Sequence, residues 1–377
     1  MIWFIVIMKV GVDTFGCDHG RSGIGSYLSS LTQHFQNTED TRFELFGAEI
    51  DRYTYGRDSN IGFESVVLPD TERAEKAWHL FLCNAFAKKQ GYDAMVFPAS
   101  SYAMPLFPTV PSVAIVNDII SETFAAKKIA ERMLIKHCLK KVSRIIAPSN
   151  YIKRDLKRLG IKQDKITVVH CGINHSMFYQ RDIITAESEM IKPFAIRRPY
   201  FLYASTMSSP LKRHIELIRA FEIFKKKTGL PHRLVLAGSE GEWTDQIKKT
   251  ALNSAFASDI FITGYFPHES FPALYAGSEG CLFPSEQEGV GLPVLEAMAT
   301  GIPVACSRAG ALQEIAGEKA VLFNSENIEE MALAIEKIAT DTNARKKMIK
   351  EGIDWAEKFN WENTARETIE VLKSIVK

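Results

Sequence analysis

Residues 284–310 read PSEQEGVGLPVLEAMATGIPVACSRAG, and this stretch decides the fold. Proline just inside the start of a helix and glycine just after its end are typical boundaries, so the stretch predicts a helix at about 293–300. The short apolar run Pro303–Cys306 follows directly and predicts a buried strand. A loop, a helix and a strand in this order indicate an α/β protein.

Two glutamates of this stretch, Glu288 and Glu296, indicate a binding site. We expect Glu288 in the glycine-containing loop and Glu296 in the first turn of the helix. Backbone N–H groups of such a loop form an anion site where the helix begins. A carboxylate beside an anion site needs a partner of its own, and the hydroxyls of a sugar would suit it, since one carboxylate can accept two hydrogen bonds from a vicinal diol. The alternative is an acidic residue that only favours a helix N-terminus.

The stretch closely resembles the Glu-x7-Glu signature of retaining glycosyltransferases of family 4, which have the GT-B fold. The resemblance implies that Glu296 binds the ribose of a nucleotide sugar and that Glu288 is a catalytic residue that meets the hexose. The loop and helix start between them are expected to line the donor site through Gly289, Val290, Gly291 and Leu292. The match continues through Ala297-Met298-Ala299, Gly301, Pro303-Val304, Ser307, Gly310 and Glu314.

Length and composition limit the remaining possibilities. A chain of 377 residues predicts two domains, and its net charge of +1 argues against a protein that binds nucleic acid along its whole length. Six scattered cysteines without a CxxC pair indicate reduced thiols in a cytoplasmic protein. There is no metal-ligand spacing, and no apolar run reaches the roughly 18 residues of a membrane span. The natural start is open between Met1 and Met8.

Strands and helices alternate in both halves, which predicts two doubly wound parallel sheets. The resemblance implies that these Rossmann-like domains face each other across a cleft. We expect an acceptor-side domain at 1–180, a linker at 181–198 and a donor domain at 199–360. The tail at 361–377 is expected to be a helix that crosses back to the first domain.

The N-terminal half carries two weaker signals. The strand Lys9–Asp13 is followed by a glycine loop, and the resemblance implies that Gly23 and Gly25 approach the donor diphosphate; a tight turn without this role is the alternative. A second strand ends at Asn117, where family members usually carry a histidine that contacts the donor sugar. Asparagine can donate and accept hydrogen bonds but cannot take a positive charge, so a role in sharing protons is in doubt there. The loop 98–111 either lines an acceptor pocket or is a packed connector.

The donor half carries the expected cation. Lys212 falls on the family lysine that opens a helix, where its charge would neutralise the departing diphosphate; a solvated surface lysine is the alternative. The family arginine is missing, because its position falls on Thr206 or Met207, and Arg213 is expected to compensate by binding the donor. Tyr265 and Phe266 resemble the turn whose backbone lies along the nucleotide base.

Residues 121–165 hold 13 Lys or Arg against 4 Asp or Glu, and we expect a long amphipathic helix at 125–143 and a second one at 149–160. These basic helices indicate peripheral contact with an anionic membrane at its cytoplasmic face, or else ordinary solvated helix faces.

The combined prediction is a metal-independent retaining hexosyltransferase without a cofactor. It would move a sugar from a UDP- or GDP-linked donor to a glycan or a lipid-linked acceptor in polysaccharide synthesis, without a nucleic-acid partner. The alternative is a nucleotide-sugar-binding protein with a degenerate site that no longer transfers. The sequence leaves open the sugar, the base, the acceptor, the linkage and the oligomeric state.

Overall fold

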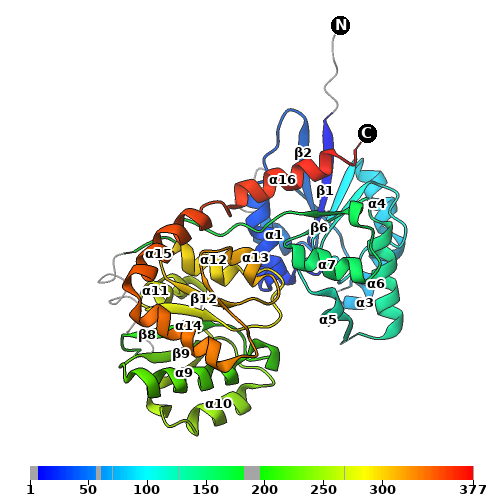
Figure 1. Ribbon diagram of the computed structural model, residues 1–377. Helices are drawn as coiled ribbons and strands as arrows, with labels where there is room; N and C mark the ends of the chain where they lie inside the picture. Colours follow the sequence, from blue (N-terminus) through cyan, green and yellow to red (C-terminus); the bar gives the residue numbers. More distant parts are fainter. Residues whose placement is uncertain are drawn as a thin grey trace. The chain divides into compact units, whose positions relative to one another are not determined.

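A computed structural model describes residues 7–56, 61–69, 71–125, 127–181, 196–266 and 268–376. Its contacts divide the chain into two compact units, Met1–Gly172 with Trp361–Lys377 and Ile173–Asn360. Each unit is a parallel sheet with helices packed on it (Figure 1). Residues 173–180, which the sequence assigned to the first domain, group with the second unit, and most of the expected linker lies outside the described residues.

The first unit contains a sheet of seven strands in the order β3-β2-β1-β4-β5-β6-β7. All its neighbouring strands are parallel. The order reverses between β1 and β4, and ligands of doubly wound sheets bind beyond the strand ends at such a point. Its strands are β1 (Met8–Asp13), β2 (Thr41–Gly47), β3 (Gly62–Ser65), β4 (Ala94–Phe97), β5 (Ser112–Ile115), β6 (Arg144–Ala147) and β7 (Ile166–Val168).

The helices of the first unit flank this sheet. The last helix, α16, returns to this unit, where Trp361 packs edge-on against Tyr27 and the Thr364 hydroxyl donates to the His170 carbonyl at 2.8 Å. The helices are α1 (Gly23–Gln33), α2 (Asp51–Tyr55), α3 (Glu72–Phe81), α4 (Cys83–Gln90), α5 (Ile120–Ala125), α6 (Ile129–Lys141), α7 (Asn150–Arg158) and α16 (Trp361–Lys373).

The second unit has a parallel sheet of six strands in the order β10-β9-β8-β11-β12-β13, so the prediction of two doubly wound sheets is confirmed. Its strands are β8 (Tyr200–Ala204), β9 (Arg233–Ala237), β10 (Ile260–Gly264), β11 (Gly280–Phe283), β12 (Val304–Ser307) and β13 (Val321–Phe323). Its helices are α9 (His214–Thr228), α10 (Thr244–Leu252), α11 (Phe271–Ala276), α12 (Leu292–Ala299), α13 (Leu312–Ala316), α14 (Ile328–Thr340) and α15 (Thr342–Ala356).

The helices differ from the sequence prediction in two places. The helix expected at 125–143 is shorter: α6 begins only after Lys128, whose backbone is extended and whose N–H donates to Glu131, and it ends at Lys141. The helix α15 was not expected at all. The Asp341 side chain accepts the N–H of Ala344 at its start, and α15 packs on α12.

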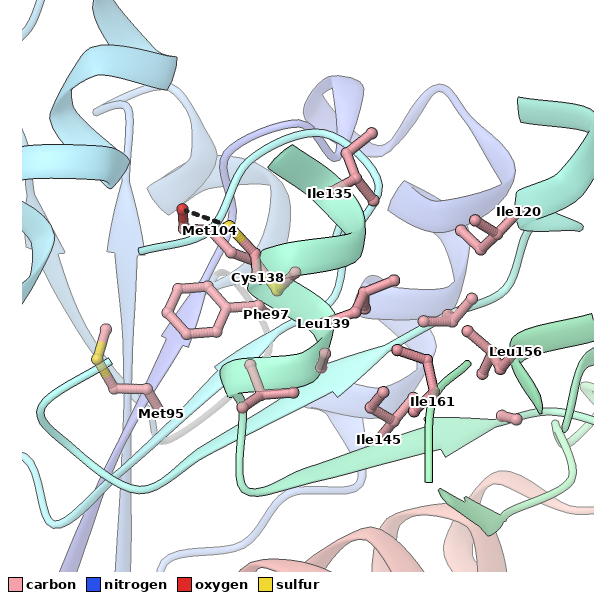
Figure 2. Packing of buried hydrophobic residues seen from close by; sticks show 14 of the residues in the cluster. Met95, Phe97, Met104, Ile120, Ile135, Cys138, Leu139, Ile145, Leu156 and Ile161 are labelled. Atoms are coloured by element: carbon pink, nitrogen blue, oxygen red, sulfur yellow. Dashed lines mark hydrogen bonds between the residues drawn. The ribbon is translucent and has the colours of Figure 1, made fainter. Parts of the chain in front are cut away.

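The core of the first unit includes one face of α6. Ile135, Cys138 and Leu139 point from this helix toward β4 and β6 (Figure 2). All three are buried together with Phe97 and Ile145 of the sheet. Burying a side chain of this kind contributes about 1.5–3 kcal/mol, so this face fixes α6 on the sheet.

Candidate functional site

The loop 284–291 joins β11 to α12 in the second unit. Gly291 has a left-handed backbone (φ 79°) and caps α12, and Pro293 follows in the first turn of the helix. Since the helix begins at Leu292, Glu296 lies in its second turn and not in the first, as the sequence suggested. Gly289, Val290, Gly291 and Leu292 therefore form the path from the loop into the helix N-terminus.

Glu288 forms an ion pair with Lys212. The Nζ atom of Lys212 lies 2.9 Å from Oε2 of Glu288, and the two side chains are 22% and 28% exposed. Lys212 follows β8 and Glu288 follows β11, and these two strands are neighbours in the sheet. A carboxylate and an ammonium group thus lie side by side and still reach solvent.

The backbone of Glu288 is held from the other side by Gly310, which has a left-handed conformation (φ 63°). A Cβ atom on Gly310 would lie 2.7 Å from both the nitrogen and the oxygen of Glu288. The N–H of Ala311 also donates to the carbonyl of Glu288 at 2.8 Å. Gly310 therefore positions the loop, a role that its place after β12 alone could not reveal.

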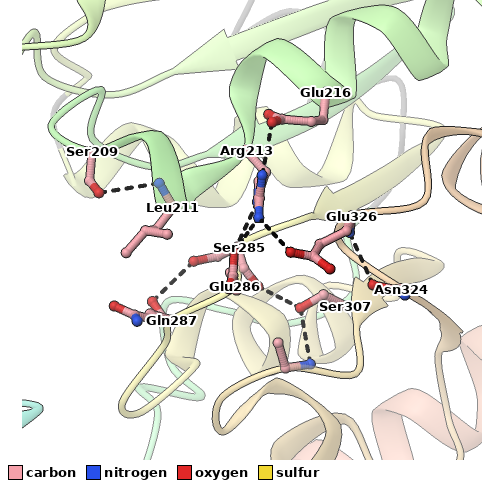
Figure 3. A network of polar contacts seen from close by, with 11 residues as sticks. Ser209, Leu211, Arg213, Glu216, Ser285, Glu286, Gln287, Ser307, Asn324 and Glu326 are labelled. Atoms are coloured by element: carbon pink, nitrogen blue, oxygen red, sulfur yellow. Dashed lines mark hydrogen bonds and ion pairs between the residues drawn. The ribbon is translucent and has the colours of Figure 1, made fainter.

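Arg213 links the Lys212 segment to the 284–291 loop (Figure 3). Its own backbone is left-handed (φ 56°), which is uncommon for a residue with a side chain. Its guanidinium donates from Nε to Glu286 at 3.0 Å and from Nη1 to Glu216 at 3.0 Å, and Glu326 lies 3.4 Å from Nη2. The N–H of Glu286 in turn donates to the carbonyl of Leu211 at 2.8 Å. Three carboxylates thus surround the arginine that was expected to bind the donor.

Glu296 contacts a tyrosine that the sequence did not single out. The Tyr275 hydroxyl donates to Oε2 of Glu296 at 3.3 Å. Burial, together with the charge of Glu296, raises the pKa of Tyr275 well above its ordinary value. The hydroxyl therefore stays protonated and donates to the Glu296 carboxylate.

A buried histidine lies beneath Lys212. His214 begins α9, and its ring centroid lies 4.7 Å from that of Tyr203, whose hydroxyl donates to the carbonyl of Lys212 at 2.9 Å. Burial, together with the charge of Lys212, lowers the pKa of His214 to about 4. The imidazole is therefore neutral at neutral pH and adds no charge near the ion pair.

Of the two residues expected along the nucleotide base, only one is accessible. Tyr265 is 70% exposed and follows the left-handed Gly264 (φ 71°) at the end of β10. Phe266 is 4% exposed, and its ring centroid lies 5.5 Å from that of Phe271. Phe266 thus packs in the core, and Tyr265 is the side chain that can meet a ligand.

The two glycines of the first unit differ. The side chain of Ser22 caps α1 by accepting the N–H of Gly25 at 3.2 Å. A Cβ atom on Gly25 would lie 2.3 Å from the Cys17 carbonyl oxygen, whereas a Cβ atom on Gly23 would meet no atom within 4 Å. Gly25 is therefore required for close packing of the loop on the helix, and Gly23 is the one that leaves open space at the helix start.

Asn117 lines a pocket of about 230 Å³ beyond the ends of β4 and β5. The pocket is also lined by Gly16 and Ile24, so Asn117 and the loop before α1 share it. The Oδ1 atom of Asn117 is buried and accepts no hydrogen bond from the described residues. Residues 98–102 form another wall, so the first part of the 98–111 loop lines a pocket.

The predicted site residues thus form two groups, one in each unit. The second unit brings together Lys212, Arg213, Glu288 and the start of α12, with Glu296 further along this helix. The first unit brings together Asn117 and the loop that leads to Gly23. Within the described ranges no group of three or more His, Cys, Asp or Glu side chains could hold a metal ion. None of the helices in the described part of the chain is both long and apolar enough to cross a bilayer.

Relatives of the chain are found in bacteria. The O-antigen chain mannosyltransferase B of Escherichia coli is 32% identical over 174 residues, which is 46% of this chain and 45% of that protein. A D-inositol 3-phosphate glycosyltransferase of Kribbella flavida is 25% identical over 71% of this chain and 65% of its own length. The chain therefore spans about half the length of the first relative.

Solved structures show the fold. The structure of Anabaena HepE in complex with UDP matches with a TM-score of 0.77 at 16% identity, and the match covers 98% of this chain and 100% of that one. Residues 21–177 match Glycosyltransferase Family 4, and residues 187–355 match Glycosyl transferases group 1. With its two parallel-sheet units, the chain belongs to the group 1 glycosyltransferases with the GT-B fold.

Proposed function

We propose that the protein is a retaining glycosyltransferase that moves a hexose from a nucleotide-diphosphate sugar to a glycan or a lipid-linked acceptor. The observation that carries this proposal is the half-buried pair of Lys212 and Glu288 beside the N-terminus of α12. An ammonium group and a helix N-terminus both favour a diphosphate. The neighbouring carboxylate favours a sugar that becomes positively charged as it reacts.

In this mechanism the acceptor hydroxyl attacks the anomeric carbon from the side on which the diphosphate leaves. An oxygen of the leaving phosphate takes the hydroxyl proton, so no protein nucleophile is needed. Lys212 stabilises the departing diphosphate, and Glu288 stabilises the oxocarbenium-like sugar. Transfer is metal-independent in this proposal, because Lys212 and the helix N-terminus supply the positive charge.

The other residues position the donor. Glu296 binds the ribose hydroxyls, with Tyr275 orienting its carboxylate, and Tyr265 lies along the base. Arg213 acts on the donor through the loop that carries Glu288, since its guanidinium is occupied by Glu286 and Glu216. Asn117 offers its buried amide oxygen to a sugar hydroxyl in the pocket of the first unit.

The relatives suggest the substrates. The E. coli relatives are an O-antigen chain mannosyltransferase and a serotype-specific mannosyltransferase, which supports a hexose and a surface glycan or lipid-linked acceptor. The matched HepE structure holds UDP, which supports a UDP-linked donor, and a GDP-linked donor is the other one that we propose. Such a donor implies action in the cytoplasm, and a lipid-linked acceptor implies contact with the inner face of the membrane through the basic helices at 125–160.

Thermal unfolding with UDP, GDP, ADP and dTDP tests the donor site. A nucleotide at a hundred times its dissociation constant should stabilise the protein by about 2.7 kcal/mol. Glu296→Gln should abolish this shift, whereas Glu329→Gln, at an exposed position of α14, should retain it. No shift with any nucleotide in the unchanged protein would contradict the donor site.

The anomeric configuration of the product, followed by NMR, tests retention. An inverted product would overturn the mechanism. Donor binding without transfer or donor hydrolysis would favour a non-transferring protein. That alternative is supported by Asn117 in place of histidine and by the absence of arginine at Thr206 and Met207.

A further inference from the structure

The helix α6 has two unlike faces. Ile135, Cys138 and Leu139 point into the core of the first unit (Figure 2). The opposite face carries Ile129 and Met133, which are one turn apart and 73% and 67% exposed. Two large apolar side chains thus lie uncovered on the outer face of a helix.

Phe107 extends this apolar surface from a neighbouring loop. Its side chain is 55% exposed, and its ring centroid lies 5.1 Å from that of His137 on α6. The amide nitrogen of Asn84 donates to the carbonyl of Phe107 at 2.9 Å and holds the loop in place. Close to Asn84 in the chain, Phe81 and Leu82 are 73% and 56% exposed. The apolar surface is therefore built from α6 and the 107 loop, and two further exposed apolar side chains lie near Asn84 in the chain, at the junction of α3 and α4.

Positive charge borders this surface. Lys136 and Lys140 lie on the outer face of α6, and the Nζ atom of Lys141 lies 5.4 Å from the centroid of the Phe107 ring. Within the described part of the chain, no carboxylate forms an ion pair with any of these three lysines.

Two acids of the region, Asp155 and Glu131, are engaged elsewhere. Asp155 is buried and accepts the N–H of Ser121, and Glu131 accepts the N–H of Lys128 at the start of α6. The positive charge of the lysines is therefore left for an external anion.

We propose that this amphipathic face, made of Phe107, Ile129, Met133, Lys136, Lys140 and Lys141, binds the headgroup layer of an anionic lipid bilayer. The apolar side chains enter the boundary between headgroups and acyl chains, and the lysines attract the lipid phosphates. Uncovered apolar anchors beside unpaired lysines distinguish this surface from the core of a protein interface, where lysine is depleted. These residues would make the membrane contact proposed above. Binding to the bilayer does not depend on the proposed function, but its purpose, access to a lipid-linked acceptor, rests on that function.

Vesicle flotation with the full chain tests the face. The protein should float with vesicles that contain phosphatidylglycerol and not with vesicles of phosphatidylcholine alone, and salt should weaken binding. Lys136→Gln with Lys140→Gln should lower the affinity roughly thirtyfold. Ile129→Ser with Met133→Ser should lower it by about tenfold or more.

Matched controls come from the second unit. Leu252→Ser and Leu333→Ser alter side chains that are 77% and 57% exposed, and Lys347→Gln alters a lysine that is 73% exposed. These variants should bind anionic vesicles as the unchanged protein does.

Three outcomes would overturn the proposal: no binding to anionic vesicles, equal binding to neutral vesicles, or equal losses in the control variants. Binding to duplex DNA without binding to vesicles would also overturn it. The nucleotide-dependent thermal shift should persist in every variant of the amphipathic face. Its absence from the unchanged protein would count against the donor site alone, so the two proposals can fail separately.

Discussion

The two units use the same local plan, in which a strand leads through a glycine loop into a helix, but they fix the loop in different ways. In the first unit the loop after β1 follows Asp13, the last residue of the strand, whose carboxylate lies 2.7 Å from the Nε2 atom of His79. The side chains of this pair are 3% and 0% exposed. In the second unit the loop after β11 is held by Lys212 and Arg213 through pairs that reach solvent.

This difference separates stability from function. A buried pair has no access to a ligand, so its partners can only hold the fold. A half-exposed pair contributes little to stability but can exchange its partner for a substrate. The comparison predicts that changes in the β1 loop alter unfolding, and that changes in the β11 loop alter activity.

The largest expected effect is on His79. His79→Leu leaves the Asp13 carboxylate buried without its partner and should reduce the free energy of unfolding by about 3–5 kcal/mol. Urea unfolding measures this loss. His34→Leu, at an exposed position, should change it by less than about 0.5 kcal/mol. Equal effects of the two variants would refute the structural role of the pair.

The same pair makes stability depend on pH. Burial by itself lowers the pKa of His79, but the charge of Asp13 and hydrogen bonds to Asp13 and to the Glu75 carbonyl raise this pKa above its ordinary value overall. The folded protein then holds the proton more tightly than the unfolded chain, whose histidine has a pKa of about 6.5. The stabilisation is therefore complete below pH 6.5 or so and is lost as the pH rises through the folded pKa. The unchanged protein should show this fall in unfolding free energy, and His79→Leu should lack it.

The next effect is on catalysis. Lys212→Met should lower turnover by roughly 10²–10³-fold, because it removes the charge that meets the leaving diphosphate. Its free energy of unfolding should change by no more than about 1 kcal/mol, since the pair with Glu288 is partly exposed. Lys347→Met on α15 is the control and should leave turnover unchanged. A large loss of unfolding free energy in Lys212→Met, with turnover unchanged, would reverse the comparison.

Smaller effects on stability are expected from substitutions of Gly25 and Gly23, which both lie in the first turn of α1. Gly25→Ala should destabilise the protein by about 1–3 kcal/mol, because the new methyl group would collide with the Cys17 carbonyl. Gly23→Ala should be close to neutral in thermal unfolding, because its Cβ atom would meet open space. A loss of nucleotide binding in Gly23→Ala would support its proposed place beside the diphosphate.

The smallest effect concerns the network around Arg213. Glu286→Gln weakens the contact that ties Arg213 to the 284–291 loop, and it should cost at most about 1 kcal/mol of stability, less at high salt. Turnover should fall several-fold, because the loop that carries Glu288 loses a support. Glu240→Gln, which removes an exposed pair with Lys248, should leave turnover intact. Equal turnover in both variants would show that the network has no part in positioning.

The sequence by itself determined the parts that depend on a few neighbouring residues. Pro293 and Gly301 placed α12 within one residue of its bounds, and Ser149 caps α7 at the start of the helix expected at 149–160. Proline, glycine and capping residues act on their own stretch of backbone, so no distant contact is needed to interpret them. The family resemblance then supplied roles for Glu288, Glu296 and Lys212, and those roles stay predictions.

Only the tertiary structure decided which side chains meet. Lys212 and Glu288 are 76 residues apart and pair because β8 and β11 are neighbours in the sheet. Packing turned Phe266 into the core and left Tyr265 outside, although the two residues are adjacent in the sequence. Packing also left Ile129 and Met133 exposed. The sequence shows the spacing of apolar residues along a helix, but it does not show which face of the helix packs against a sheet.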